Sequence, residues 1–187
     1  MNAFSTIGKP AAKQSIGQLC VQVVKRALTS PLIRAGLVLG AGFGGLADGI
    51  ILHSILGWHH MICYSTDCQP ATVAQLQLEN TQDGYFLLVV WLMVLTGTAM
   101  LFRAASQAGL EASGRVLLGS MLAGCGMFNF LEGLINHQIL GLHHVVPGSP
   151  HQFLFDMLYL ANGALFFLVG AWLIQSCRKE IQRRYGQ

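Results

Sequence analysis

Four long apolar stretches, separated by shorter polar connections, dominate the pattern of the chain. A helix needs about 20 apolar residues to cross the hydrocarbon layer of a bilayer, and each stretch reaches or approaches that length. The pattern predicts an all-α membrane protein, a bundle of four transmembrane helices. The predicted spans are Leu32–Trp58, Gly84–Phe102, Val116–Leu142 and Phe153–Ile174.

The basic residues all fall on one side of these spans. The 11 Lys and Arg residues lie before or at the start of the first span, around the second connection, or after the fourth span. The first and third connections contain none. Because short cytoplasmic segments are enriched in Lys and Arg, we expect the N and C termini to be cytoplasmic and the first and third connections to be periplasmic.

The same pattern divides the chain into four parts. Residues 1–31 form a cytoplasmic lead in which Ile16, Leu19 and Val23 recur at helical spacing. This lead could be an amphipathic helix on the inner leaflet or a short helix packed under the bundle. Residues 32–103 form a first helix hairpin, 104–175 a second, and 176–187 a basic cytoplasmic tail.

The two hairpins contain matching motifs. Residues 48–60 read DGIILHSILGWHH, and residues 132–144 read EGLINHQILGLHH. Eight of the thirteen positions are identical, and the first stays acidic. Asp83 and Gly97 of the second span match Asp156 and Gly170 of the fourth, 73 residues later. We therefore predict two duplicated helix hairpins, related by a pseudo-two-fold axis along the membrane normal.

Polar side chains gather at one depth near the outer face. At 1.5 Å per residue, Asp48 lies roughly 24 Å from the inner end of its helix. Asp83 and Asp156 stand where their helices re-enter from outside. Acidic and His residues inside a membrane mark functional sites, although a single such residue could be a neutral, hydrogen-bonded member of the bundle.

Imidazole and carboxylate groups are ligands of Fe, Zn, Mn and Cu(II). Gly57 and Gly141 could end their helices and fold each His pair back, so that ligands converge as in di-iron helical bundles. The favoured geometry places Asp48, His53 and His60 opposite Glu132, His137 and His144, while the binding member of each His pair stays open. The predicted cofactor is a transition metal (Fe, Cu or Zn), as one or two ions. The candidate ligands are Asp48, His53, His59, His60, Asp83, Glu132, His137, His143, His144 and Asp156.

Two cysteines, Cys63 and Cys68, lie close together in the first outer connection. In an oxidising periplasm, a disulfide between them is favoured over metal binding.

Composition supports the membrane class and excludes a nucleic-acid partner. The chain is 53% hydrophobic and only 10% charged, whereas soluble domains carry about 25% charged residues. The net charge of +3 comes with no basic stripe. The expected partners are the lipid bilayer and other membrane proteins, in a homo- or hetero-oligomer.

The paired motifs resemble those of a family of bacterial four-helix membrane proteins known as domain of unknown function 2243. The resemblance covers Ala35 to Ile174 and implies a multi-pass protein of the bacterial inner membrane. It also implies a His four residues after the acid of the second helix, where this chain has Leu87.

Three functional classes follow from these residues, and none specifies a substrate or a catalytic residue. The first is a redox or oxygen-type metalloprotein with a dinuclear site near the periplasmic face. The second is a copper- or zinc-handling assembly factor or carrier. The third is a haem-b electron carrier with His53 and His137 as axial ligands, which the neighbouring acidic residues disfavour.

Overall fold

The structure, a computed structural model, describes residues 30–65, 67–106 and 114–185, with side chains as far as Cys177. The described residues form long helices and no strand, which confirms the all-α prediction. Most of the predicted cytoplasmic lead lies outside these residues. The elements are α2 (Pro31–Asp48), η1 (Gly49–Ile55), α3 (Val73–Ser106), α4 (Gly114–Glu132), η2 (Gly133–Ile139) and α5 (Gln152–Tyr185).

Four helical segments are long and apolar enough to cross a membrane, which confirms a multi-pass membrane protein. They are Pro31–Ile55, Val73–Ser106, Gly114–Ile139 and Gln152–Cys177. The second helix begins at Val73, well before the predicted start at Gly84. At 34 residues it is about 50 Å long, longer than the hydrocarbon layer of about 30 Å. Its first turns therefore extend beyond the span that hydropathy predicts.

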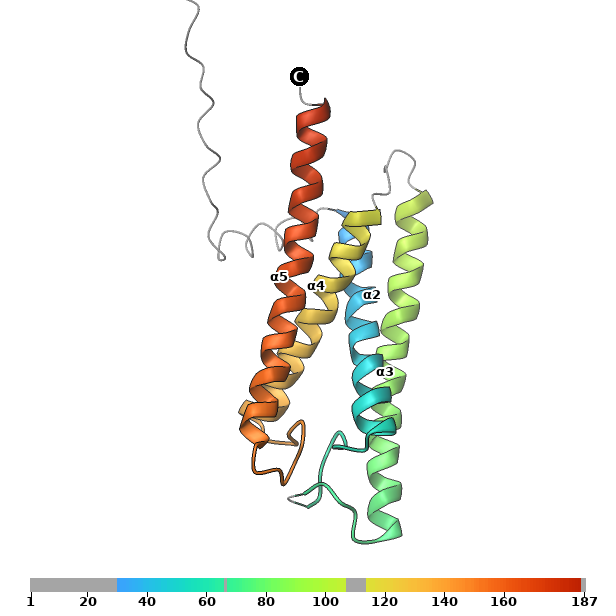
Figure 1. The fold of residues 1–187 in the computed structure, drawn as a ribbon. Helices are drawn as coiled ribbons and strands as arrows, with labels where there is room; N and C mark the ends of the chain where they lie inside the picture. The colour runs from blue at the N-terminus through green and yellow to red at the C-terminus, as the bar shows by residue number, and fades with distance from the viewer. Residues whose placement is uncertain (1–29, 66, 107–113, 186–187) are drawn as a thin grey trace, which may run out of the picture.

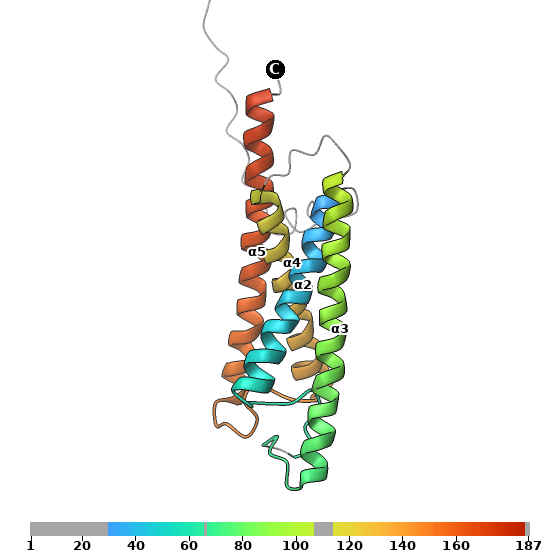
Figure 2. The same cartoon turned by 90° about the vertical axis from the view of Figure 1, so that its right-hand side faces the viewer.

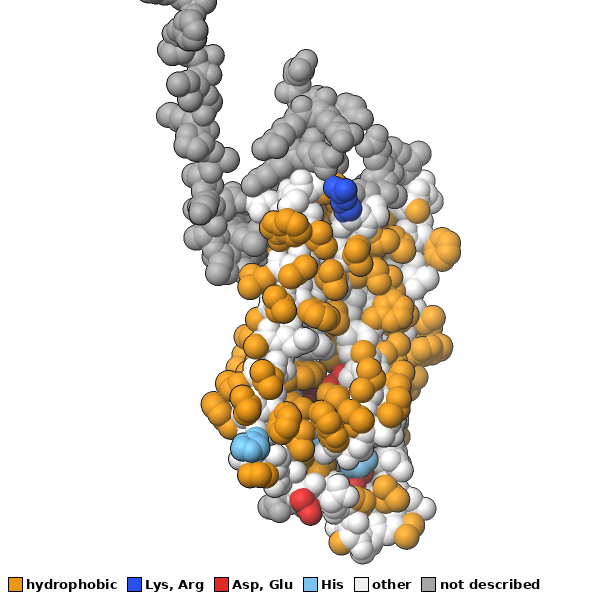
Figure 3. All heavy atoms as spheres, viewed as in Figure 1, with side chains coloured by type: hydrophobic (Ala, Val, Ile, Leu, Met, Phe, Trp, Pro, Cys, Tyr) orange, Lys and Arg blue, Asp and Glu red, His pale blue; other side chains and the backbone are white. Residues whose placement is uncertain are grey.

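The helices form a row in the order α3, α2, α4, α5 (Figures 1 and 2). The central pair is α2 and α4, while α3 packs on α2 and α5 packs on α4. The connections from η1 to α3 and from η2 to α5 lie at the same end of the bundle, which we call the loop end. Figure 3 shows hydrophobic side chains over the middle of the bundle and His and acidic side chains towards the loop end.

Glycines bring the central helices together. A Cβ atom on Gly40 of α2 would overlap the backbone carbonyl of Met121, and one on Gly124 of α4 would overlap that of Leu37. Small residues allow membrane helices to approach closely without a hydrophobic driving force. These two glycines therefore allow the close α2–α4 contact.

Candidate metal centre

Each central helix changes its pitch immediately after its acidic residue. α2 ends at Asp48 and continues as the π-helical η1, and α4 ends at Glu132 and continues as η2. A π-helix bonds residue i to residue i+5 and occurs frequently at functional sites. The wider turn brings an acid and a His five residues apart to one face, whereas in an α-helix they would be about 140° apart. Asp48 therefore meets His53, and Glu132 meets His137.

A glycine then ends each π-helical segment. Gly57 has φ +57° and Gly141 has φ +58°, a left-handed conformation that glycine adopts without strain. After each glycine the backbone closes with a hydrogen bond to an earlier turn, from Trp58 N–H to Leu52 O (3.0 Å) and from Leu142 N–H to Asn136 O (2.9 Å). The predicted end of the helix between the histidines is therefore present in both hairpins.

The two loops then cross over each other. His59 donates its Nδ1–H to the carbonyl of Val145 (2.9 Å), and His143 donates its Nδ1–H to the carbonyl of Met61 (3.0 Å). The two acceptors are 84 residues apart, as are the two donors, so each loop makes the same contact with the other. Because a carbonyl only accepts, each ring keeps a lone pair on Nε2.

Four buried imidazoles from both hairpins form what we call the central cluster: His53, His59, His137 and His143. The His59 and His143 rings stack with centroids 4.6 Å apart. His53 lies 4.6 Å from His59, and His137 lies 4.9 Å from His143. All four residues are at most 3% exposed, so water is largely excluded from the space between them.

Two carboxylates face the Nε2 side of this cluster. Asp48 Oδ2 is 3.4 Å from His53 Nε2. Glu132 Oε1 is 3.5 Å from His137 Nε2 and 3.1 Å from His143 Nε2. Both carboxylates therefore face ring nitrogens rather than solvent.

A second pair of carboxylates lies on the Nδ1 side of His53 and His137, the two cluster histidines that stand on helices. Asp83 Oδ1 is 3.0 Å from His53 Nδ1, and Asp156 Oδ1 is 3.6 Å from His137 Nδ1. These acids also accept backbone hydrogen bonds, Asp83 from Met61 N–H (2.8 Å) and Asp156 from Val145 N–H (2.9 Å). They orient the rings and fix the loops.

The structure separates the two histidines of each pair. His59 and His143 belong to the central cluster, whereas His60 and His144 each contact one of the two aspartates on the Nδ1 side. His60 Nδ1 is 2.7 Å from Asp83, and His144 Nδ1 is 2.7 Å from Asp156. The favoured geometry of the sequence analysis, with His60 opposite His144, is therefore not the one the structure brings together. The sequence could not distinguish the two members because only the direction of the loop after the glycine decides it.

The ring nitrogens of the cluster need a cation or extra protons. Burial, together with the neighbouring His143 and His53 rings, lowers the pKa of His59 to about 3, so this ring is neutral at neutral pH. Its Nε2 has no hydrogen-bond partner, and neither do Asp48 Oδ2 or the two ring nitrogens of His137. Buried acceptors without donors are disfavoured, and a metal ion would satisfy them.

Two overlapping sets of ligand atoms have the spacing for metal ions. One consists of Asp48, His53 and His59, and the other of His59, His137 and His143; within each set the atoms lie within 4.8 Å of one another. Metal–N and metal–O bonds of about 2.0–2.2 Å place two ligands of one ion at most about 4.4 Å apart, so ligand atoms 4.8 Å apart would have to move closer around an ion. The residues present thus fit a transition metal, and His59 belongs to both sets.

The sequence analysis did not single out Tyr159. Its hydroxyl donates to Asp48 Oδ1 (3.3 Å), and its ring lies 5.4 Å from that of His137. The matching residue of the first hairpin, 73 positions earlier, is Phe86, which stacks on His53 at 5.5 Å. Tyr159 could have been found in the sequence as the aromatic residue that aligns with Phe86. Because only Tyr159 has a hydroxyl, the two halves of the site are unequal.

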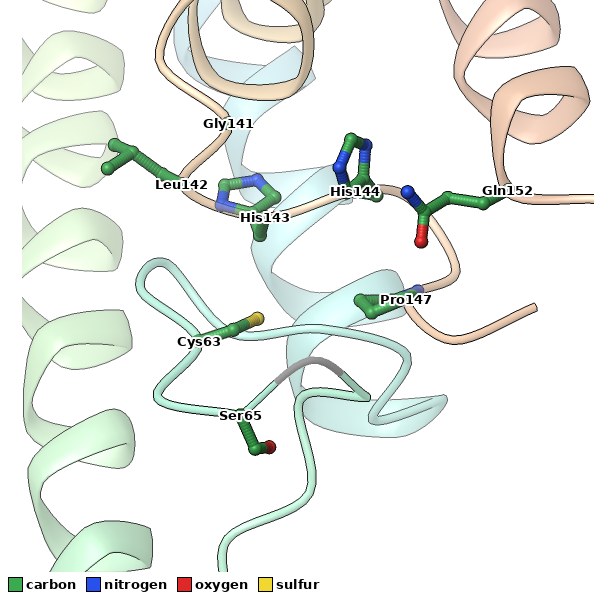
Figure 4. Close-up of a pocket in the computed structure, with 8 residues that line it drawn as sticks. All are labelled: Cys63, Ser65, Gly141, Leu142, His143, His144, Pro147 and Gln152. Atoms are coloured by element: carbon green, nitrogen blue, oxygen red, sulfur yellow. The ribbon is translucent and has the colours of Figure 1, made fainter.

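A pocket of about 330 Å³ opens beside the cluster at the loop end. It is lined by Cys63, Ser65, Gly141, Leu142, His143, His144, Pro147 and Gln152. Figure 4 shows the loop that carries His143 and His144 next to the loop that carries Cys63 and Ser65, with the Ser65 side chain pointing away from the two histidines. Cys63 and Cys68 form a disulfide within the loop that borders this pocket. Of the central cluster, His143 borders this pocket.

Comparison with known proteins gives one match. A family model described as "Predicted membrane protein (DUF2243)" matches residues 35–177. No curated protein and no solved structure matches the chain. The match covers the first span from Ala35 onward and the other three spans in full, and it includes every residue of the central cluster. The chain therefore belongs to the DUF2243 family of predicted membrane proteins.

Proposed function

We propose that this protein is an integral-membrane metalloprotein that holds two transition-metal ions in the central cluster. Asp48 and His53 would bind one ion, Glu132 and His137 the other, with His59 and His143 between them. One observation carries the proposal: the Nδ1 side of each ring faces a carboxylate or carbonyl, while the Nε2 side faces the cluster interior. Metal-binding histidines usually have this arrangement, in which an outer partner fixes the tautomer.

The donor set and its geometry favour a redox or oxygen-type role. It contains imidazole and carboxylate without thiolate, which suits Fe, Zn or Cu(II) and disfavours Cu(I). The two ligand sets overlap at His59, so two ions held by them would lie close together, as in the dinuclear sites of helical bundles that use carboxylates and histidines. His59 Nε2 would bind one of the two ions, because its Nδ1–H is donated to the carbonyl of Val145. His59 and His143 lie against the rings of both His53 and His137, which leaves no space for a porphyrin and argues against haem.

Copper or zinc handling is the second candidate, and the pocket favours it. Two inward-facing ligands, His59 and His143, stand on loops rather than helices, and His143 lines the pocket at the loop end. An ion could therefore be exchanged with a partner. A carrier would release its metal to a chelator within minutes, whereas a redox centre would retain it and change its spectrum with a reductant.

The positive-inside pattern supports a placement in the bacterial inner membrane with the loop end in the periplasm. The recurrence of most cluster contacts at offsets of 84 and 73 residues supports the proposed duplication of the hairpins. Both remain proposals.

Elemental analysis and a visible spectrum of the purified protein test the function. We expect Fe, Cu or Zn to co-purify without a haem Soret band. Metal-free protein whose thermal stability does not change on adding any of the three ions would contradict the proposal, because a ligand that binds only the folded state stabilises it.

A further inference from the structure

Glu79, on one of the first turns of α3, is buried without a hydrogen-bond partner. Its side chain is 0% exposed, and neither Oε1 nor Oε2 has a hydrogen-bond partner. An ionised carboxylate in such a place is strongly disfavoured unless a cation or a proton compensates it. The central cluster does not use this residue, so its compensation must come from elsewhere.

The nearest basic group is the outer face of His60. Asp83 accepts the Nδ1–H of this ring at 2.7 Å, which leaves a lone pair on Nε2. That nitrogen lies 3.8 Å from Glu79 Oε2, beyond the usual 2.7–3.2 Å of a hydrogen bond. A separation of this size fits two ligands of one metal ion with bonds of about 2.0–2.2 Å.

Gln82 offers a third donor one turn further along α3. Its Nε2 donates to the hydroxyl of Tyr64 (2.7 Å), so its Oε1 faces away from that contact. Oε1 is buried and has no hydrogen-bond partner. Residues three apart are neighbours on a helix face, so Glu79 and Gln82 place buried oxygens without hydrogen-bond partners on one face of α3. His60 Nε2 lies 3.8 Å from Glu79 on this segment.

Among its described residues, the second hairpin has no such arrangement. The residue that matches Glu79 is Gln152, 73 positions later, and its Oε1 already accepts from Gly148 N–H at 3.3 Å. His144, the match of His60, has a side chain 31% exposed, compared with 11% for His60. The buried acid is therefore particular to the first hairpin.

We propose that Glu79, His60 and Gln82 form a separate binding site for a divalent transition metal such as Zn²⁺, outside the central cluster. This inference does not depend on the function proposed for that cluster, since it shares no ligand with it.

Zn²⁺ titration of the whole protein in detergent tests the inference in a variant that carries His59→Ala and His143→Ala. These changes remove two ligands of the central cluster. We expect one Zn²⁺ per chain to remain, to be lost when Glu79→Gln is added, and to be kept when Asp67→Asn is added. Asp67 is an exposed acid of the neighbouring loop, so it controls for the loss of one charge.

The inference would be overturned if the double variant bound no Zn²⁺, or if it still bound Zn²⁺ after Glu79→Gln was added. A protonated Glu79 would then explain how this side chain is buried. If Glu79→Gln does not fold, Gln82→Leu replaces it and should weaken binding about tenfold or more; unchanged affinity would also overturn the inference. If the wild type and the double variant bind the same single ion, the function proposed for the central cluster fails while this site stands.

Discussion

At the scale of single residues, the central cluster depends on which ring nitrogen carries the proton. Two backbone carbonyls, those of Met61 and Val145, fix the loop histidines, and two aspartates face the helical ones. The aspartates were among the predicted ligands, and their contacts favour a positioning role instead. Backbone carbonyls have no signature in the sequence, so this half of the arrangement could not be predicted.

Asp156→Asn tests the positioning role. The substitution removes the charge that faces His137 and weakens the acceptor for Val145 N–H, the residue whose carbonyl holds His59. Loss of such an outer partner typically lowers metal affinity by roughly 10–100-fold. We expect a decrease of this size in a metal titration, with the fold retained by circular dichroism.

The control for this experiment is Asp67→Asn, an exposed acid outside the cluster, which should leave the affinity unchanged. Equal affinity of Asp156→Asn and wild type would show that Asp156 does not position the ligands.

At the scale of secondary-structure elements, the helices and their approximate spans could be predicted from hydropathy. Gly57 and Gly141, which lie between the histidines of each motif, predicted the turn that ends each helix. The π-helical turns could not, because hydropathy does not depend on helical pitch. The signal that was present is the acid–His spacing of five, found at Asp48–His53 and again at Glu132–His137. In a regular α-helix these side chains would not meet.

The close contact of α2 with α4 predicts a specific effect of Gly40→Ala. The added Cβ would overlap the carbonyl of Met121, so the helices would have to separate. Overpacking of this kind destabilises by about 1–3 kcal/mol. We expect a lower midpoint of thermal unfolding in detergent.

Gly84→Ala is the matched substitution, because a Cβ at Gly84 meets nothing within 4 Å. It should be neutral, or stabilising by up to about 1 kcal/mol, since Ala favours a helix over Gly. If both substitutions had the same effect, helix contact would not be the reason for glycine at position 40.

At the scale of the whole molecule, both hairpins contribute to one site at the loop end. The direction of the bundle in the membrane determines which compartment that site faces. Thr72 stands at the loop end and Ser106 at the end of α3 that faces the other way; both are exposed. The distribution of basic residues predicts that Thr72 is periplasmic.

Cysteine labelling checks this orientation in a variant with Cys20, Cys125 and Cys177 replaced by Ser. Thr72→Cys should react with a membrane-impermeant thiol reagent added to intact cells, whereas Ser106→Cys should react only after lysis. The reverse pattern would place the loop end, with its pocket, in the cytoplasm.

The metal content of two His variants tests the central claim most directly. His59 belongs to both sets of ligand atoms, whereas His144 faces outward onto Asp156. Analysis of the purified proteins should show that His59→Ala loses one or both ions of the central cluster, relative to wild type, with the spectrum of any remaining ion changed, and that His144→Ala keeps both ions unchanged. A His59→Ala protein with undiminished metal, or one that loses a single ion while the other is spectroscopically unchanged, would contradict a shared site.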